Sequence, residues 1–86
     1  MPRICWTSEA SGELAELDEG NQQAIRRRVE ILADFPYAGV ALKRDWGGFR
    51  KLSAALLSWV IIYTVRDQEM VIIGYLRHAR SRWESR

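Results

Sequence analysis

Residues 57–65 of this 86-residue chain read Leu-Ser-Trp-Val-Ile-Ile-Tyr-Thr-Val, an almost unbroken run of apolar, aromatic and β-branched residues. Such side chains favour extended backbone, and a run without polar alternation indicates a central strand covered on at least part of both faces. Residues 70–76 form a second run of this kind after the short segment 66–69. A connection of this length predicts an antiparallel hairpin.

The segment before these two strands supplies a third. Residues 49–52 read as a short strand, whereas residues 36–48 contain Pro36, Gly39, Gly47 and Gly48 and show no sustained period. We therefore expect a loop over residues 36–48, followed by a three-stranded antiparallel meander.

The N-terminal half has a different pattern. Residues 3–7 alternate polar and apolar side chains as a half-buried strand does, and Thr7 and Ser8 can cap a first helix that Gly20 ends. Asn21 can cap a second helix, with its apolar residues at helical spacing and its end set by Pro36. We predict one α+β domain over residues 1–86, with the order β-α-α-β-β-β and both helices on one face of the sheet.

Composition excludes several classes of function. With a single cysteine, Cys5, and a single histidine, His78, the chain can form neither an internal disulfide nor a metal site with recognisable ligand spacing. At 86 residues a cofactor-filled cavity is not expected. The most apolar run stops at Arg66, well short of the roughly 18 residues that span a bilayer, and no secretory signal is visible, so we expect a cytoplasmic protein without a membrane partner.

Charge is distributed unevenly along the chain. Residues 1–42 carry four arginines and seven acidic residues, a net charge of −3, whereas residues 43–86 carry nine lysines and arginines and four acidic residues, a net charge of +5. This polarity favours an anionic partner, such as RNA, at the C-terminal half.

Three motifs in this order carry a resemblance to a known family. Residues 31–36, Ile-Leu-Ala-Asp-Phe-Pro, resemble an "L-x-x-x-P" helix end, and residues 42–52, Leu-Lys-Arg-Asp-Trp-Gly-Gly-Phe-Arg-Lys-Leu, resemble an "L-K-G-x-x-x-G-L-Y-K-L" passage. Residues 59–63, Trp-Val-Ile-Ile-Tyr, resemble a "Y-R-I-I-Y" strand. Together they make the chain similar to the RelE/ParE superfamily of toxins from type II toxin-antitoxin modules.

The resemblance implies one of two activities. RelE-like members are metal-independent endoribonucleases that cut messenger RNA in the ribosome and so inhibit translation, whereas ParE-like members bind and poison DNA gyrase without chemistry of their own. Both are neutralised by a cognate antitoxin, with a homodimer or a heterotetramer with antitoxin as possible assemblies. We expect mRNA cleavage, with gyrase inhibition as the alternative and a decayed, inactive toxin as a third reading.

The resemblance also implies a set of catalytic residues. Lys51 falls on the family's strand lysine, which could stabilise phosphoryl charge or accept a proton. Arg77 and Trp83 reproduce a RelE-like spacing, which suggests Arg77 as a transition-state clamp and Trp83 as a stacking surface for a base, although Trp83 could equally pack against the sheet.

Other basic residues complete the expected site. His78 carries the imidazole, which ordinarily exchanges protons near neutral pH, and Arg80 is a further catalytic candidate. His78-Ala79-Arg80 is also similar to the His-Gly-Arg passage of ParE-like chains, where no catalysis is implied. We expect Lys43, Arg44 and Arg50 to contact RNA phosphates.

The departures from the RelE-like pattern favour the alternative. Val60 stands where RelE-like chains have arginine, and Ser53 stands where a further basic residue is common. Arg80 or Arg50 could compensate for the missing charge. Leu56 and Leu57 replace a more polar hairpin turn, and if exposed they would favour contact with an antitoxin or a second copy.

Overall fold

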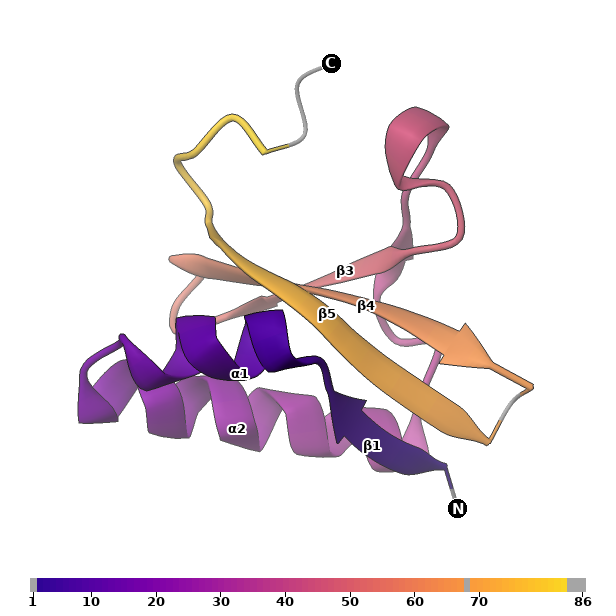
Figure 1. Ribbon diagram of the computed structural model, residues 1–86, viewed down its shortest axis with the longest axis horizontal. Coiled ribbons are helices and arrows are strands. Elements are labelled where there is room, and N and C mark those ends of the chain that lie inside the picture. The colour runs from indigo at the N-terminus through magenta and orange to yellow at the C-terminus, as the bar shows by residue number, and fades with distance from the viewer. Residues whose placement is uncertain (1, 68, 84–86) are drawn as a thin grey trace.

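A computed structural model of the protein describes residues 2–67 and 69–83. The elements are β1 Arg3–Trp6, α1 Ser8–Ala15, α2 Glu19–Asp34, β2 Val40–Ala41, the 3-10 turn η1 Arg44–Trp46, β3 Arg50–Ala54, β4 Trp59–Arg66 and β5 Met70–His78. The strands form one sheet in the order β1-β5-β4-β3-β2, in which β1 and β5 are parallel and all other neighbours are antiparallel. Both helices lie on one side of the sheet, and η1 and the C-terminal segment lie on the other (Figure 1). The predicted α+β class is therefore confirmed, with β2 as a two-residue addition inside the predicted loop.

The boundary between the helices differs from the prediction. The side chain of Asp18 accepts a hydrogen bond from the Asn21 N–H at 2.9 Å, so Asp18 is the N-cap of α2. Gly20 consequently lies in the first turn of α2 and does not end α1, which stops at Ala15. The prediction that Asn21 caps this helix was wrong, because the Asp18 carboxylate is already placed to accept the free amides of the first turn.

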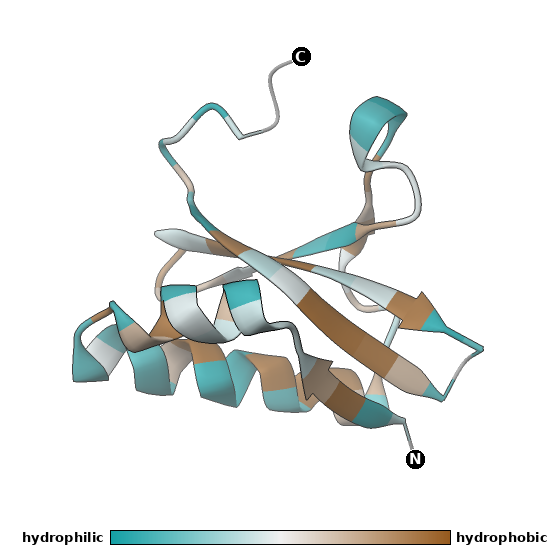
Figure 2. Ribbon diagram, viewed as in Figure 1, coloured by the Kyte–Doolittle hydropathy of each residue, from teal (hydrophilic) through white to brown (hydrophobic). Residues whose placement is uncertain are grey.

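The main core lies between the helices and the sheet. It consists of apolar residues from both helices and from the helix-facing side of β3, β4 and β5: Ala10, Leu14, Ile25, Val29, Leu32, Leu52, Ala54, Ile61, Tyr63, Val71, Ile73 and Leu76. The brown residues of Figure 2 gather along β5 and the end of β4, whereas η1 is hydrophilic. The other side of β4 is also covered, since Val60 and Ile62 are buried in a second, smaller cluster. The predicted two-sided burial of the central strand is thus confirmed.

The strand ends determine where the basic residues lie. β4 begins at Trp59, because residues 55–58 form the turn from β3, and β5 continues past the predicted end at Leu76 to His78. A register shift between Ile62 and Tyr63 places Gly74 at a bulge in β5. Arg77 and His78, which lie beyond the predicted strand 70–76, therefore belong to the sheet.

One close approach fixes the chain before β2 against β4. The Tyr63 side chain is fully buried, and its hydroxyl accepts a hydrogen bond from the Gly39 N–H at 2.8 Å. A Cβ at Gly39 would lie 2.6 Å from the Lys51 carbonyl oxygen and 2.7 Å from this hydroxyl, so only glycine fits. Burial raises the pKa of the Tyr63 phenol above its usual value, although the Gly39 hydrogen bond and the nearby Arg50 charge act in the opposite direction.

Candidate functional site

The sheet face opposite the helices, called here the open face, carries two of the four residues predicted to be catalytic, Lys51 and Arg77. Two rows of paired residues cross it: Lys51, Ile62 and Tyr75 in one row, and Ser53, Val60 and Arg77 in the other. Val60 is 6% exposed and lies between Ser53 and Arg77. The centre of the open face is therefore apolar, with single cations on either side of it.

Four aromatic residues, called here the aromatic cluster, cover this apolar centre: Trp46, Phe49, Tyr75 and Trp83. Trp46 is the hub, with its ring centroid 5.8 Å from Phe49, 5.4 Å from Tyr75 and 5.7 Å from Trp83, each in an edge-on arrangement. The loop that presents Trp46 is closed by backbone hydrogen bonds from Leu42 to Phe49 and from Phe49 to Trp46. Edge-to-face packing of this kind stabilises a cluster beyond its apolar burial alone.

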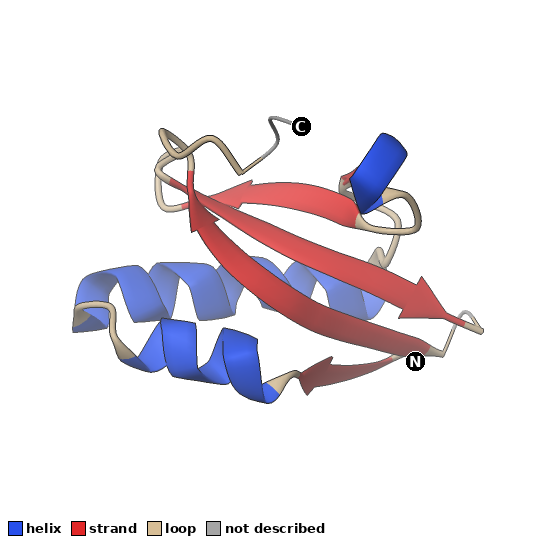
Figure 3. Cartoon of the chain, turned by 45° about the horizontal axis from the view of Figure 1, so that its top comes forward, coloured by secondary structure: helices blue, strands red, loops and turns tan. Residues whose placement is uncertain are grey.

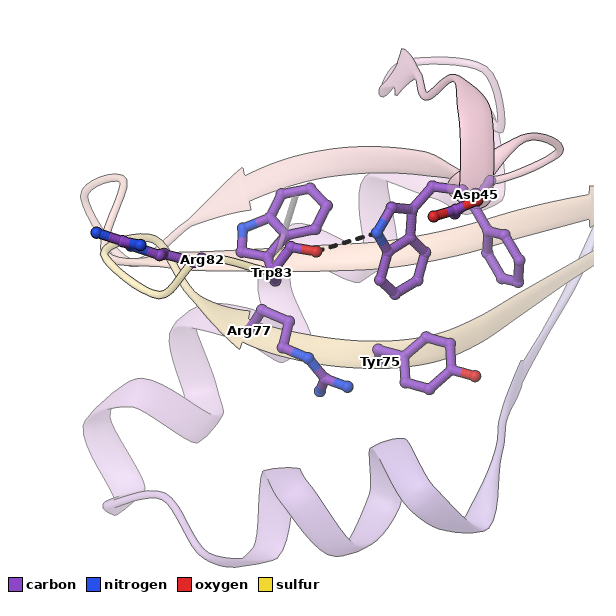
Figure 4. A pocket seen from close by; sticks show the side chains of 7 residues that line it. Asp45, Tyr75, Arg77, Arg82 and Trp83 are labelled. Atoms are coloured by element: carbon purple, nitrogen blue, oxygen red, sulfur yellow. Dashed lines mark hydrogen bonds between the residues drawn. The ribbon is translucent and has the colours of Figure 1, made fainter. Parts of the chain in front are cut away.

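The C-terminal segment is held on the same face. The Trp46 indole N–H donates to the Trp83 carbonyl oxygen at 3.1 Å, and the Lys51 Nζ lies 5.8 Å from the centroid of the Trp83 ring. A cleft of about 540 Å³ opens beside these residues, lined by the aromatic cluster together with Asp45, Arg77 and Arg82. In Figure 4 the Arg82 side chain extends away from Tyr75, whereas the Arg77 side chain turns toward the helices.

Arg77 is held by acidic residues of α1. Its Nη1 donates to the Glu13 Oε2 at 2.6 Å, and its Nη2 lies 3.8 Å from the Glu9 Oε2. The other oxygen of Glu13 accepts a hydrogen bond from the Leu76 N–H at 2.9 Å. Glu13 thus satisfies an amide of β5 beyond the end of β1 and fixes the arginine that follows it.

Two of the predicted site residues lie on the helix-facing side. Arg50 and the buried Leu52 lie two positions apart on β3 and therefore on the same face of the sheet. The Arg50 Nη1 donates to the Gly39 carbonyl at 2.7 Å, and its guanidinium lies 4.9 Å from the Tyr37 ring centroid. The His78 ring packs edge-on against Trp59 at 5.2 Å, and its Nδ1 accepts from the Arg80 N–H at 3.1 Å. The structure therefore brings Lys51, Arg77 and Trp83 together and separates Arg50 and His78 from them.

The remaining predicted residues are exposed. Lys43 and Arg44 lie in the loop around η1, and Arg80 lies in the turn after β5. That turn is fixed to the β3–β4 connection, since the Ala79 N–H donates to the Ser58 carbonyl at 2.8 Å.

Most of the residues that line the cleft were not predicted from the sequence. Trp46, Phe49, Tyr75, Asp45 and Arg82 line it and were not predicted. Trp46 and Phe49 could have indicated this site from the sequence, because large aromatic residues in a glycine-containing loop usually pack on an apolar surface. The described residues contain no group of three or more His, Cys, Asp or Glu side chains that could hold a metal ion. Nor does any helix in residues 2–67 or 69–83 have the length and apolarity needed to cross a membrane.

The five-stranded sheet, with two helices on one face and a basic C-terminal segment on the other, defines a RelE/ParE superfamily toxin. Residues 4–83 match the family model of the ParE toxin of type II toxin-antitoxin systems, parDE, and the chain belongs to this family. A comparison with curated proteins finds no match.

Solved structures share the fold at low sequence identity. The toxin-antitoxin complex RelBE2 from Mycobacterium tuberculosis matches with a TM-score of 0.78 and 22% identity, over 91% of this chain and 99% of that chain. The intact RelBE complex from E. coli matches with a TM-score of 0.77 and 13% identity, over 94% and 100%. The chromosomal ParDE system from P. aeruginosa matches with a TM-score of 0.76 and 16% identity, over 93% and 98%.

Proposed function

We propose that this toxin acts by binding DNA gyrase, without cleaving RNA, and that a cognate antitoxin neutralises it. The observation that carries the proposal is the apolar centre of the open face, where Val60 and Ile62 lie under the aromatic cluster. A face covered by aromatic rings, with one cation on either side, suits a protein contact better than a reacting phosphate.

The positions of the ionisable residues support a binding function. Cleavage of RNA by its own 2′-hydroxyl needs a base, an acid and cations around one phosphate. Lys51 and Arg77 share the open face, but Arg77 is paired with Glu13 and the only histidine packs against Trp59 on the other face. The residues proposed from sequence for catalysis are thus spread over both faces of the sheet.

RNA cleavage is the second candidate, and the cleft is the observation that favours it. The Trp83 and Tyr75 rings line a cleft that Arg82 also borders, with Lys51 close to Trp83. Aromatic and cationic side chains in this arrangement can stack on a base and contact its phosphate.

One pair of assays separates the two candidates. We expect purified, antitoxin-free toxin to inhibit DNA supercoiling by gyrase and to leave mRNA on translating ribosomes uncut in primer-extension mapping. Added antitoxin should restore supercoiling. Unaffected gyrase together with new mRNA cuts contradicts the proposal, provided that Lys51→Ala removes those cuts and Arg27→Ala, which changes an exposed arginine of α2, does not.

The antitoxin is expected to be a partner because the RelBE and ParDE structures that share this fold are toxin-antitoxin complexes or systems. Co-expression of this chain with the product of an adjacent short reading frame, followed by co-purification, tests this part of the proposal independently of the toxin's target.

A further inference from the structure

The turn that joins β3 to β4, residues 55–58, exposes two leucines. Leu56 is 98% exposed and Leu57 is 73% exposed, and neither belongs to a core cluster. The turn is closed by a hydrogen bond from the Ser58 N–H to the Ala55 carbonyl at 3.1 Å. Leucine side chains this exposed bury little apolar surface when the chain folds alone, so they do not stabilise its core.

The backbone of the same turn is unfavourable for its sequence. Ala55, Leu56 and Leu57 have φ angles of 53°, 55° and 73°, in the left-handed region. Glycine, asparagine and aspartate are the residues that turns ordinarily place there. A segment that departs from local preference in both exposure and conformation is expected where function requires particular side chains.

The surroundings of the turn are cationic. The Ala79–Ser58 hydrogen bond places the turn beside the segment that contains Arg80, and the two loops lie next to each other in Figure 3. From α2, the Arg28 Nε donates to the Ser53 carbonyl at 2.8 Å at the end of β3. Residues 46–66 and 70–83 contain no aspartate or glutamate. The two leucines therefore form an apolar projection flanked by arginines.

We propose that Leu56 and Leu57 insert into an apolar pocket with an acidic rim on the toxin's target protein. This inference rests on the proposed function, because it takes gyrase as that target. A projection of two apolar side chains fits a preformed pocket, which a folded target protein offers. A symmetric contact with a second copy would bring the flanking arginines of both chains together, which like-charge repulsion opposes.

The test uses a variant that keeps the turn and removes its apolar side chains. Leu56→Asn with Leu57→Asn places a residue that tolerates left-handed backbone at both positions, so the double variant should fold at least as stably as the wild type. We expect it to raise the concentration that half-inhibits gyrase at least about 100-fold and to abolish growth arrest in a host without antitoxin. Ala55→Gly relaxes the same turn and keeps both leucines, and it should inhibit as the wild type does.

The outcomes distinguish this inference from the proposed function. Wild-type toxin that arrests growth without affecting gyrase refutes the gyrase proposal, and the growth assay of the double variant still tests the turn. A folded double variant that arrests growth normally overturns the inference. It is also overturned if the substitutions weaken antitoxin binding or dissociate a wild-type dimer, because the leucines then contact an antitoxin or a second copy.

Discussion

Replacement of Glu13 by glutamine tests whether α1 holds Arg77. One carboxylate oxygen accepts from the Leu76 N–H at 2.9 Å and the other from the Arg77 Nη1 at 2.6 Å. In Glu13→Gln the amide oxygen can still accept from Leu76, but the amide NH₂ then faces the guanidinium, and two donors cannot bond to each other. The substitution therefore removes the ion pair with little change in shape.

The magnitude follows from the burial of the pair. Hydrogen bonds to charged groups contribute about 1.5–3 kcal/mol, whereas exposed ion pairs contribute less than about 1 kcal/mol. The Arg77 and Glu13 side chains are 28% and 30% exposed, so screening by solvent is partial. We expect Glu13→Gln to lower the free energy of unfolding by about 1–2 kcal/mol, and each kcal/mol to lower the Tm by roughly 4–8 °C in a domain of this size.

A double-mutant cycle measured by urea denaturation isolates the pairwise energy. Arg77→Gln and Glu13→Gln should each destabilise the protein, and the double variant should lose about 1 kcal/mol less than the sum of the two. Glu9→Gln is the matched control, because Glu9 is 57% exposed and lies 3.8 Å from Arg77, so its effect should be much smaller. If the two substitutions add within about 0.3 kcal/mol, Glu13 does not hold Arg77, and a main support for a non-catalytic open face is lost.

Three further substitutions test other contacts. Tyr63→Phe leaves the Gly39 N–H without its acceptor and should lower the free energy of unfolding by about 1–3 kcal/mol in urea titrations. The pKa of the Tyr63 phenol is raised in the folded protein, so the unfolded chain loses the phenol proton first. The free energy of unfolding of the wild type should therefore fall as pH rises above about 10. If Tyr63→Phe shows the same fall at alkaline pH, this expectation is contradicted. Gly39→Ala should lower the Tm clearly, because its Cβ meets a backbone oxygen at 2.6 Å, whereas Gly12→Ala, with open space around the added atom, should not. Trp46→Phe removes the indole N–H that holds Trp83 and should speed tryptic cleavage after Arg80 and Arg82 at temperatures well below unfolding; an unchanged cleavage rate means that this hydrogen bond does not restrain the C-terminal segment.

The strands and the helix faces could be predicted from local patterns. The apolar runs in residues 57–65 and 70–76 identified β4 and β5 because β-branched residues favour extended backbone whatever their partners are. The parallel pairing of β1 with β5 could not be predicted in this way, since it joins residues at opposite ends of the chain, such as Arg3 and Met70. The end of β5 was missed because Arg77 and His78 are polar, and only pairing with Val60 and Trp59 extends the strand to them.

The candidate site was predicted less completely than the fold. Motif spacing selected Lys51 and Arg77, which the structure places on one face of the sheet, and alternation along β3 would have assigned Arg50 to the other face. The partner of Arg77 is Glu13, 64 positions away in the chain, and no local pattern indicates that contact. Residue roles inferred from a basic segment alone therefore miss the acids that meet it after folding.

The charge asymmetry of the sequence is reduced by the fold itself. Glu9 and Glu13 of the acidic half meet Arg77 of the basic half, so part of the apparent polyanion site is an internal ion pair. Two exposed arginines near residues 55–58 come from different halves of the chain: Arg28 bonds to the Ser53 carbonyl, and Arg80 follows the Ala79–Ser58 hydrogen bond. A protein surface with apolar pockets and acidic rims complements this arrangement better than a nucleic-acid backbone, which offers charge without an apolar pocket. Salt should therefore weaken target binding only modestly, and a steep salt dependence of the kind that phosphate contacts produce would indicate RNA instead.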